Sequence, residues 1–505
     1  MRLTNSKAMR DADGHAIHVL GVPSTLLMTN AAKNLAAEAF ELMGTNKSAV
    51  IFCGSGNNGG DGIAAATYLL RRGVGIRCFL VGERLKMTPD CAEMERRLIE
   101  LGGTLELFNP DDDLVKKLAD NAGVIIDALF GIGLNSELRS NALAAVRLMN
   151  EAKAPIVSAD IASGVEADTG RILGEAVRAD VTVTFSLAKI GHFAQPGCTC
   201  CGKLRVAEIG IPAEAMMNAE TNVFSVSAED ISLPTRPKIS HKGDFGKLLI
   251  IGGSVGYTGA PVLCAKAAAR SGAGLIYLGV PDKIYEITAG RLLESMPFPL
   301  DDRGNGRISM SALPVIMDKL DNCDVCVVGC GLSRSEEIGE LIRSMVTEST
   351  KQLVIDADGL FALGDDSNII KSANRPPVLT PHDGEYLRLG GVLTGDRVSD
   401  ARDFAQSREC VLVLKGHRTI CAFPDGEVYI ISAGNPGMAK GGSGDVLSGM
   451  IGAFLGQLSL KKAVITACAV HALAGDLCAE RYGEYSMLPS DIIEAIPEIT
   501  KSISR

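Results

Sequence analysis

The sequence predicts a protein of the α/β class with two domains, each built on a mostly parallel sheet. Short apolar runs alternate with helical patterns along the chain, which is typical of repeated βαβ units. A chain of 505 residues is too long for one hydrophobic core. Between Pro212 and Gly243 the alternation gives way to a polar, proline-bearing stretch. We therefore predict domains at residues 1–218 and 241–505, with a linker at residues 219–240.

The apolar runs give the expected strands in chain order. In the first half they are residues 49–53, 75–81, 123–130, 154–160 and 181–186. In the second half they are residues 247–253, 275–280, 325–331, 352–358, 376–381, 410–416 and 428–434. In an open parallel sheet, ligands bind beyond the carboxyl ends of the strands, so the loops after these runs are where a site is expected.

The composition argues against several classes of function. The net charge of −10 disfavours binding to nucleic acid or to an anionic membrane. The first residues lack the apolar core of a secretory signal, and no uninterrupted apolar run reaches membrane-spanning length. We therefore expect a cytoplasmic protein. The 14 cysteines include a C-x-C-C at Cys198–Cys201 and a C-x-x-C at Cys323–Cys326, but neither has a second cluster at metal-site spacing. Reduced, packed thiols are the expectation.

Polar loops follow the strands of the first half. The first strand runs into GSGNNGGDG at residues 54–62, in which asparagine and aspartate add directional contacts to a glycine-rich turn. Two later strands end in DALFGIG, from Asp127, and in DIASG, from Asp160. Because these strand ends meet at one sheet edge, the following side chains should converge: Asn58, Asp61, Asp127, Asp160 and Ser163.

Such a cluster suits two kinds of chemistry. Hard oxygen ligands favour a monovalent or a hard divalent cation. Neighbouring aspartates also suit proton abstraction, because each carboxylate shifts the pKa of the others. The structural alternative is that each aspartate only caps the helix that follows it.

The second half carries its most informative motif, NPGMAKGGSGDVLSG, at residues 435–449. Glycines precede Asp445, and a helical pattern with one apolar face follows. A helix N-terminus behind residues without side chains offers an anion-binding site, and an ionised Asp445 beside it can accept a proton from a hydroxyl group. No Gly-Lys-Ser/Thr follows the glycines, so this is not a Walker loop. The alternative is a turn that caps a core helix.

Other loops of the second half follow strands as well. Gly252–Ser254 and Gly331 end strands, and His382 follows the strand at residues 376–381. Residues 415–419, KGHRT, place basic groups and a hydroxyl after a buried strand, which fits phosphate or purine contacts. A structural histidine and an ordinary β-turn are the alternatives at the last two positions.

These motifs resemble a known family over almost the whole chain, the bifunctional NAD(P)H-hydrate repair enzymes. GSGNNGGDG, DALFGIG, DIASGVEADTG and TVTFSLAKIGHFAQPG resemble the epimerase domain. HKGDFGKLLIIGGS, YTGAP, SGAGL, DADGL, LTPH and NPGMAKGGSGDVLSG resemble the ADP-dependent dehydratase domain. The resemblance implies an N-terminal Rossmann-like three-layer sandwich and a C-terminal ribokinase-like α/β domain.

The resemblance also implies site residues. For the epimerase substrate they are Asn57, Asn58, Gly59, Gly60, Asp61, Gly131, Ile132, Gly133, Leu134, Asn135, Ser136, Glu137 and Asp160. A potassium ion would be held by Asn58, Asp127 and Ser163. For the dehydratase substrate the residues are Ala260, Gly331, His382 and Asp445. For ADP they are Lys415, Gly416, His417, Arg418, Thr419, Asn435, Pro436, Gly437, Met438, Ala439, Lys440, Gly441, Gly442, Ser443 and Gly444.

The implied chemistry is metabolite repair with two catalytic aspartates. Asp160 would serve epimerisation of the R and S hydrates. Asp445 would activate the ring hydroxyl of the S hydrate, which is phosphorylated from ADP, expected with Mg²⁺, and then lost as phosphate. NAD(P)H and AMP would result. We expect a homo-oligomer that binds these small molecules and no nucleic acid or membrane. A ribokinase-like small-molecule kinase and a nucleotide-sensing scaffold are the competing hypotheses.

Several positions depart from the family pattern. Thr29 stands where an acid is common, and Cys330 and Ser333 replace a proline and a glycine of a G-P-G-L-G loop. Asp383 replaces a proline after His382. Lys440 occupies a position where a small or hydroxyl residue is common, and it could contact phosphate or point to solvent. None of these changes removes a residue to which chemistry is assigned.

Overall fold

The computed structural model describes residues 1–219, 221–364 and 366–504. The contacts divide the chain into two compact units. The N-terminal unit is Arg2–Val223, and the C-terminal unit is Phe224–Arg505 together with Met1. The predicted linker, residues 219–240, contains β8 (Val223–Val226), which is an edge strand of the C-terminal sheet. The units are described separately below.

The N-terminal unit is built on a seven-stranded sheet in the order β3-β2-β1-β4-β5-β6-β7, in which all neighbours are parallel. Its order reverses between β1 and β4. The strands are β1 (Ser48–Cys53), β2 (Gly75–Leu80), β3 (Leu105–Leu107), β4 (Val124–Ala128), β5 (Ile156–Ala159), β6 (Val181–Phe185) and β7 (Lys203–Ala207). The helices are α1 (Ser6–His18), α2 (Ser24–Leu42), α3 (Asn57–Arg71), α4 (Pro89–Glu100), α5 (Asp113–Asp120), α6 (Ser140–Glu151) and α7 (Ala213–Met216).

Two apolar clusters show that helices cover both faces of this sheet. Successive side chains of a strand point to opposite faces, and β1 follows this rule. Ala49 and Ile51 pack with buried residues of α2, α3 and α4, whereas Val50 and Phe52 pack with α5 and α6. The three-layer Rossmann-like sandwich is therefore confirmed for this unit.

The C-terminal unit has a ten-stranded mixed sheet in the order β11-β10-β9-β12-β13-β14-β15-β16-β17-β8. Pairing is parallel from β11 to β15 and antiparallel from β15 through β16 to β17. Besides β8, the strands are β9 (Lys247–Ile251), β10 (Leu275–Pro281), β11 (Met296–Leu300), β12 (Val325–Val328), β13 (Gln352–Ile355), β14 (Val378–Leu379), β15 (Val411–Leu414), β16 (Ile420–Ala422) and β17 (Val428–Ile431).

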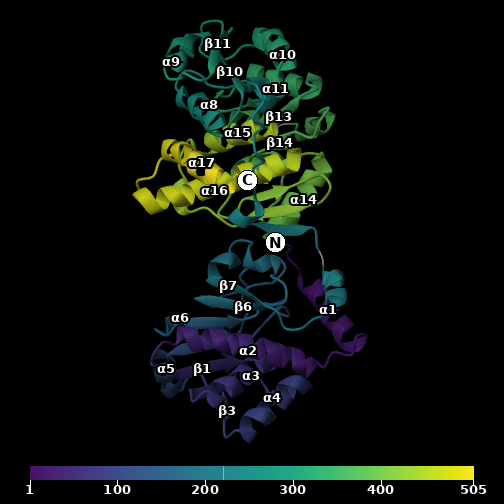
Figure 1. The fold of residues 1–505 in the computed structure, drawn as a ribbon, viewed down its shortest axis with the longest axis vertical. Coiled ribbons are helices and arrows are strands. Elements are labelled where there is room, and N and C mark those ends of the chain that lie inside the picture. Colours follow the sequence, from purple (N-terminus) through teal and green to yellow (C-terminus); the bar gives the residue numbers. More distant parts are fainter. Residues whose placement is uncertain (220, 365, 505) are drawn as a thin grey trace. The chain divides into compact units, whose positions relative to one another are not determined.

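Helices α8 (Gly259–Arg270), α15 (Ser443–Leu455), α16 (Leu460–Tyr482) and α17 (Pro489–Ile503) share one large apolar core with this sheet. Figure 1 shows α15, α16 and α17 side by side, and α15 also packs against α8. The remaining helices are α9 (Tyr285–Ala289), α10 (Leu313–Asp321), α11 (Glu336–Glu348), α12 (Asp358–Leu363), α13 (Asp383–Arg388) and α14 (Arg397–Arg408). The ribokinase-like α/β domain is confirmed.

One helix of the described residues, α16, is long and apolar enough to cross a membrane by length and composition. The sequence analysis found no uninterrupted apolar run of that length, because polar residues are scattered through this helix. Its most apolar window is 67% buried within the structure, and its neighbours are α15 and α17. This is the environment of a core helix.

Candidate active sites

A cavity of about 560 Å³ opens at the carboxyl edge of the N-terminal sheet. It lies where parallel sheets of this order bind ligands, beside the reversal between β1 and β4. The start of α3 contributes Asn57, Asn58 and Asp61 to its wall, and the loop after β4 contributes Gly131–Leu134. Asp160, which directly follows β5, completes this side. The structure thus gathers most of the predicted epimerase residues around one cavity.

Asp160 is fixed by a buried lysine. Lys189 is 1% exposed, and its Nζ donates to Asp160 Oδ1 at 2.5 Å and to Thr184 Oγ1 at 2.8 Å. Thr184 also donates to Asp160 Oδ1, at 3.2 Å. The second carboxylate oxygen, Oδ2, lies 3.1 Å from the position that a Cβ on Gly131 would take. One oxygen of Asp160 therefore contacts the lysine, and the other faces the cavity at Gly131.

The backbone of Asp160 is held in an uncommon conformation by His192. Its φ of 64° is in the left-handed region, which costs free energy for a residue other than glycine. His192 Nδ1 accepts the N–H of Lys189 at 3.0 Å, so the other ring nitrogen, Nε2, carries the proton and donates to the Asp160 carbonyl at 2.9 Å. Burial lowers the pKa of His192 to about 4, which keeps the ring neutral. His192 thus fixes both Asp160 and Lys189.

The acids of the cavity differ in proton affinity. Burial raises the pKa of Asp160, but the charge and hydrogen bond of Lys189 outweigh it and the net pKa is lowered. Burial raises the pKa of Asp61 well above its usual range, and the charge of Asp160 adds to this effect. Burial and Asp160 also raise the pKa of Asp13, on α1, to about 6. Near neutral pH, Asp160 is therefore a carboxylate beside acids that retain protons more readily.

Asp127 is fully buried and accepts hydrogen bonds on both oxygens. Its Oδ1 accepts from Ser163 Oγ at 2.6 Å and from the Leu129 N–H at 3.3 Å. Its Oδ2 accepts from Ser158 Oγ at 2.8 Å and from the Ser163 N–H at 2.9 Å. Burial raises the pKa of Asp127, although the hydrogen bonds from Ser163 oppose it. The structure thus joins two of the three predicted potassium ligands.

Asn58, the third predicted potassium ligand, lies beside Asp160. Its Oδ1 is 3.1 Å from the position of a Cβ on Gly131, the same distance as Asp160 Oδ2. Two acceptor oxygens therefore converge at Gly131, where any larger residue would contact both. Gly59 and Gly60 lie in α3. A Cβ on Gly59 would meet the Gly54 carbonyl and a Cβ on Gly60 would meet Met28, so close packing accounts for glycine at both positions. Asn135, Ser136 and Glu137 are exposed and do not line the cavity.

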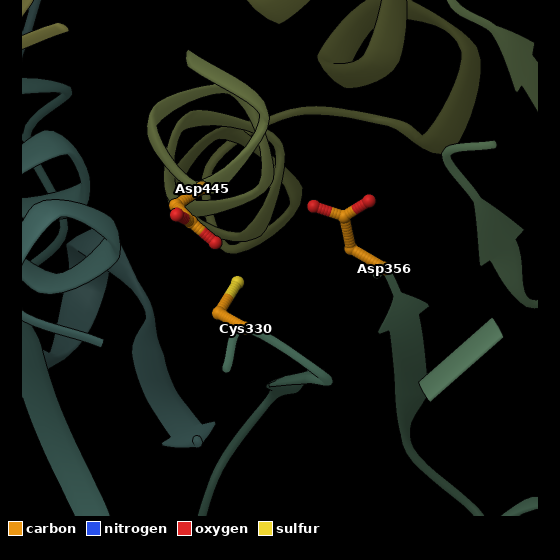
Figure 2. A group of neighbouring side chains, drawn as sticks. All are labelled: Cys330, Asp356 and Asp445. Carbon is orange, nitrogen blue, oxygen red and sulfur yellow. The ribbon is translucent and has the colours of Figure 1, made fainter. Parts of the chain in front are cut away.

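The C-terminal unit brings Asp445, Asp356 and Cys330 together, with one side-chain ligand atom of each within 4.8 Å of the others. Asp356 follows β13, Cys330 lies in the loop after β12, and Asp445 is in the first turn of α15. Figure 2 shows the sulfur of Cys330 pointing toward the carboxyl group of Asp445, with Asp356 facing them from the end of its strand. As in the first unit, a buried aspartate follows the carboxyl end of a parallel strand; here it is Asp356, and the half-buried Asp445 joins it from the start of a helix.

Lys415 is the counter-ion of this cluster, but it contacts Asp356 rather than Asp445. Its Nζ lies 3.0 Å from Asp356 Oδ1 and 3.7 Å from Glu385 Oε2. Ser448 donates to the other oxygen of Asp356 at 2.7 Å. Burial raises the pKa of Asp356, but Lys415 and Ser448 outweigh it, so the net pKa is lowered. Burial and the charge of Asp356 raise the pKa of Asp445 to about 6.

The glycine loop approaches this cluster. A Cβ on Gly444 would lie 3.3 Å from Lys415 Nζ and 3.6 Å from Asp356 Oδ2. Gly442 has a φ of 102°, a left-handed conformation that glycine adopts without strain, and it turns the chain into α15. A Cβ on Gly441 would meet nothing within 4 Å. Two predicted ADP segments, residues 415–419 and 435–444, thus meet at Lys415 and Gly444.

Other predicted ADP residues are engaged in the protein itself. Lys440 donates to the carbonyls of Tyr485 and Met487 at 2.7 and 2.6 Å, so two of the three N–H groups of its ammonium are engaged within the protein. Asn435 caps a short 3₁₀ helix, and its Nδ2 donates to Asp476 at 2.9 Å. Arg418 donates to the carbonyl of Ser432.

The four residues predicted to bind the dehydratase substrate come from different elements: Ala260 lies in α8, Asp445 lies in α15, and Gly331 and His382 lie in loops after strands. Gly331, with a φ of 68°, directly contacts Ala260, since a Cβ on it would lie 3.1 Å from Ala260 Cβ. His382 caps α13: its Nδ1 accepts the N–H of Gly384 at 3.0 Å, and its side chain is exposed. His382 therefore has a structural role as a helix cap, and its ring is also accessible to a ligand.

The structure shows how two departures from the family pattern are accommodated. Ser333, in place of a glycine, has a φ of 66° and therefore keeps the left-handed conformation that glycine favours. Asp383, in place of a proline, accepts two hydrogen bonds from Arg397 at 2.8 and 2.9 Å. Thr29 does not line the cavity. Nothing in its contacts explains its replacement of an acid.

Three residues of these sites had no assigned role in the sequence analysis. Lys189 and Asp356 lie within motifs that carried the resemblance, TVTFSLAKIGH and DADGL. Lys189 is 29 residues from Asp160 in the chain, and this separation leaves no spacing signal because only the sheet brings the two residues together. Asp13 lies in a helical segment with no glycine loop or strand end nearby.

The fold and sites define a two-domain α/β enzyme with an acid–lysine site in each unit. A family model described as NAD(P)H-hydrate dehydratase matches residues 248–498, and one described as YjeF-related protein N-terminus matches residues 24–191. A bifunctional NAD(P)H-hydrate repair enzyme of Moorella thermoacetica is 36% identical over 518 residues, covering 100% of this chain and 97% of the relative. The chain belongs to the family of bifunctional NAD(P)H-hydrate repair enzymes.

A second relative agrees with this assignment. A bifunctional NAD(P)H-hydrate repair enzyme of Thermofilum pendens is 35% identical over 515 residues, covering 100% of this chain and 97% of the relative. An ADP/ATP-dependent NAD(P)H-hydrate dehydratase of Bacillus subtilis, co-crystallised with ATP and Mg²⁺, is 27% identical. That match covers 56% of this chain and 99% of the solved chain, with a TM-score of 0.48.

Proposed function

We propose that the two activities of this bifunctional NAD(P)H-hydrate repair enzyme reside in separate units. Epimerisation of the R and S hydrates is assigned to the cavity of the N-terminal unit, with Asp160 as its base. Nucleotide-dependent dehydration of the S hydrate is assigned to the C-terminal unit, with Asp445 as its base. Epimerisation supplies the S form from the R form, so both hydrates return to NAD(P)H.

The assignment of Asp160 is supported by its environment. Lys189 lowers the pKa of Asp160 and occupies Oδ1, so the carboxylate is ionised with Oδ2 free toward the cavity. Water added next to the ring nitrogen leaves a hydroxyl on that carbon, and a base that removes the hydroxyl proton allows the ring to open. Reclosure on the opposite face inverts this carbon.

The predicted potassium site fits its donor set. Asn58, Asp127 and Ser163 all offer oxygen atoms, which hard cations prefer. The convergence of Asn58 Oδ1 and Asp160 Oδ2 beside Gly131 also suits a cation, because two acceptors meet there. Asp127 already accepts four hydrogen bonds, so it needs a free acceptor position to bind a cation. The Ser163 hydroxyl would provide that position by donating its proton to another acceptor. A bound K⁺ would orient the substrate and partly neutralise these acids.

The assignment of Asp445 carries the dehydratase proposal. Its pKa of about 6 makes it a stronger base than an ordinary aspartate while it remains mostly ionised at neutral pH. Asp445 takes the proton of the ring hydroxyl, and the hydroxyl oxygen attacks the terminal phosphorus of ADP. AMP leaves, and the phosphorylated hydrate then loses phosphate from that carbon and a proton from its neighbour. Hydroxide, a poor leaving group, departs as phosphate.

Residues around Asp445 fit the nucleotide. The first turn of α15 and the glycines before it offer backbone N–H groups to phosphate oxygens, and Lys415 lies against Gly444. Asp356 and Asp445 offer carboxylate oxygens of the kind that Mg²⁺ binds together with phosphates. A bound Mg²⁺ would neutralise charge on the phosphoryl group being transferred. ADP as the donor rests on the family resemblance, and the Bacillus subtilis dehydratase was crystallised with ATP.

The experiment that tests this function follows reduced-nicotinamide absorbance during conversion of purified S hydrate, with ADP and then with ATP. The proposal expects orthophosphate to appear in equal amount to NAD(P)H. Accumulation of a stable phosphoester without recovered absorbance would support the competing small-molecule kinase. Cytoplasmic location and homo-oligomeric assembly remain predictions from the sequence.

A further inference from the structure

Helix α1 forms part of the epimerase cavity, although it lies outside the residues that the family model matches, 24–191. It contributes Met9, Arg10, Asp13 and Ile17 to the cavity wall. The helix begins with a side-chain cap, since Asn5 Oδ1 accepts the N–H of Ala8 at 2.8 Å. The wall that faces Asp160 is therefore built from a segment to which no role has been assigned.

Hydrogen bonds fix α1 to the catalytic loops on three sides. Thr4 pairs with the chain at Lys189: its N–H donates to the Ala188 carbonyl at 2.9 Å, and its carbonyl accepts the N–H of Ile190 at 3.0 Å. Ser6 Oγ donates to Asp168 Oδ2, on the loop after Asp160, at 2.7 Å. Arg10 Nη1 donates to the Ile132 carbonyl, on the loop after β4, at 3.5 Å. These contacts determine where the next turn of α1 places Asp13.

Asp13 faces the cavity without a protein partner. Among the described residues its carboxyl group makes no hydrogen bond or ion pair, although the residue is half-buried. The charged groups that line the same cavity come from five elements: Arg10 on α1, Asp61 on α3, Asp90 on α4, Asp160 after β5 and Lys189 after β6. Lys189, the one buried ammonium group of this cavity, thus lies among several carboxyl groups, which raise one another's pKa and favour retention of a proton.

We propose that Asp13 is a second catalytic residue of the epimerase unit, a general acid that works together with the base Asp160; this rests on the epimerase assignment above. Asp160 removes the hydroxyl proton, and the bond between that carbon and the ring nitrogen breaks. The electron pair stays on nitrogen, which takes a proton from Asp13. The resulting aldehyde rotates, nitrogen attacks its other face, and both protons return to their donors. No other reactant is needed.

Asp13 suits this role better than Asp61, its neighbour on the cavity wall. Asp61 is 9% exposed, and burial raises its pKa well above its usual range, which favours the protonated form. Asp13 has a pKa of about 6 and a position nearer to solvent, so it can release and regain a proton at neutral pH. A general acid whose pKa lies near the working pH is the more effective one.

The test is the rate of R-to-S conversion by the full chain, measured between pH 5 and 9 for the wild type, Asp13→Asn and Asp160→Asn. Asp13→Asn should lower kcat/KM by about 100-fold or more, as is typical for loss of a general acid. In the wild type, kcat/KM should fall about tenfold per pH unit above the pKa of Asp13, because the acid form is lost. In Asp13→Asn this decline should disappear.

Asp11→Asn is the matched control, because Asp11 is exposed on the same helix and pairs only with Lys7 at 2.6 Å. It should behave as the wild type. Dehydratase activity reports only on the C-terminal unit, so denaturant unfolding of each variant reports whether the N-terminal unit is folded. Asp13→Glu, which keeps the carboxyl group, should retain the pH decline at a lower rate. An Asp13→Asn enzyme with wild-type activity, or with reduced activity and an unchanged decline, would overturn the role of Asp13.

The same data separate this proposal from the epimerase assignment. If the wild type and Asp11→Asn epimerise while Asp160→Asn does not, the assignment stands and the Asp13 profile alone decides the proposal. If the wild type shows no epimerisation above the uncatalysed rate, the assignment of the N-terminal unit fails, and the role of Asp13 fails with it.

Discussion

Each unit holds a lysine that contacts one aspartate, buried in the first unit and half-buried in the second, but the two units use that aspartate differently. In the N-terminal unit Lys189 contacts Asp160, the proposed base itself. In the C-terminal unit Lys415 contacts Asp356, and the proposed base Asp445 lies beside this pair. The net effects on the pKa values are opposite: that of Asp160 is lowered, and that of Asp445 is raised to about 6.

This difference shows that the strength of each aspartate as a base depends on whether the lysine of its unit contacts it directly. Asp160 is a weak base that is ionised at any working pH, which suits proton removal from a hydroxyl whose carbon already carries a ring nitrogen. Asp445 faces a carboxylate and is a stronger base, which suits activation of an ordinary hydroxyl as a nucleophile. Variants at and around each base test whether the two aspartates differ in this way.

Asp445→Asn should have the largest effect. The amide keeps the shape of the side chain but cannot accept the proton, so dehydration should fall by about 100-fold to 10,000-fold, a typical range for loss of general base catalysis. Epimerisation should be unchanged, because the other unit holds its own base. The measurement is the rate of each reaction on the same full-length protein. Loss of both activities in a folded chain would refute the assignment of one site to each unit.

Lys189→Met should reduce epimerisation and also destabilise the N-terminal unit. Without the ammonium group, the largest influence that lowers the pKa of Asp160 is lost and burial raises that pKa, so less of the base is ionised. Removing one partner of a buried ion pair costs about 3–5 kcal/mol of the free energy of unfolding. Denaturant unfolding and the acid limb of the epimerase profile measure the two effects. Lys7→Met is the matched control, since Lys7 is 81% exposed and should change neither quantity.

The acid limbs of the two activities should lie at different pH. Dehydration requires ionised Asp445, so its kcat/KM should fall about tenfold per pH unit below about pH 6. The pKa of Asp160 is lowered, so the corresponding limb of epimerisation should lie at lower pH. Parallel pH profiles of one preparation measure both. Coincident limbs would show that the two bases do not differ as their contacts indicate.

Cys330→Ala should have the smallest effect. The thiol of Cys330 faces Asp445, and its hydrogen bond lowers the pKa of that carboxyl against the effects of burial and Asp356. Without the thiol, the acid limb of dehydration should move to higher pH by less than about one unit, because a single weak hydrogen bond is lost. The rate above pH 8 should remain that of the wild type. A large loss of rate there would give Cys330 a role beyond this hydrogen bond.

The sequence predicted the central strands of both sheets and missed strands at their edges. β1, β4 and β9, among others, are continuous apolar runs because both faces are covered. β3, β7, β8 and β11 are edge strands. Most residues of β7 are exposed, and β11 contains prolines, which edge strands tolerate. β16 is a short strand of an antiparallel pair after the KGHRT loop, where only the loop had been recognised.

For the sites, sequence reasoning found the residues that follow strands and missed those that folding brings to them. Asp160 and Asp445 come after a strand and after a glycine loop, so their positions could be predicted. Lys189 reaches Asp160 only because β5 and β6 are neighbours. Asp13 faces the cavity only because Thr4, Ser6 and Arg10 tie α1 to distant loops. Contacts of that kind leave no periodic or spacing signal in the chain.

The most direct test of one site in each unit uses an equimolar mixture of R and S hydrates, ADP, and the full-length Asp160→Asn protein. Recovered reduced-nicotinamide absorbance reports how much hydrate has been repaired. The account predicts that the wild type restores all of it, whereas Asp160→Asn stops when the S form is spent and leaves the R form. Complete recovery by Asp160→Asn at the wild-type rate, or no recovery from a folded protein, would contradict it.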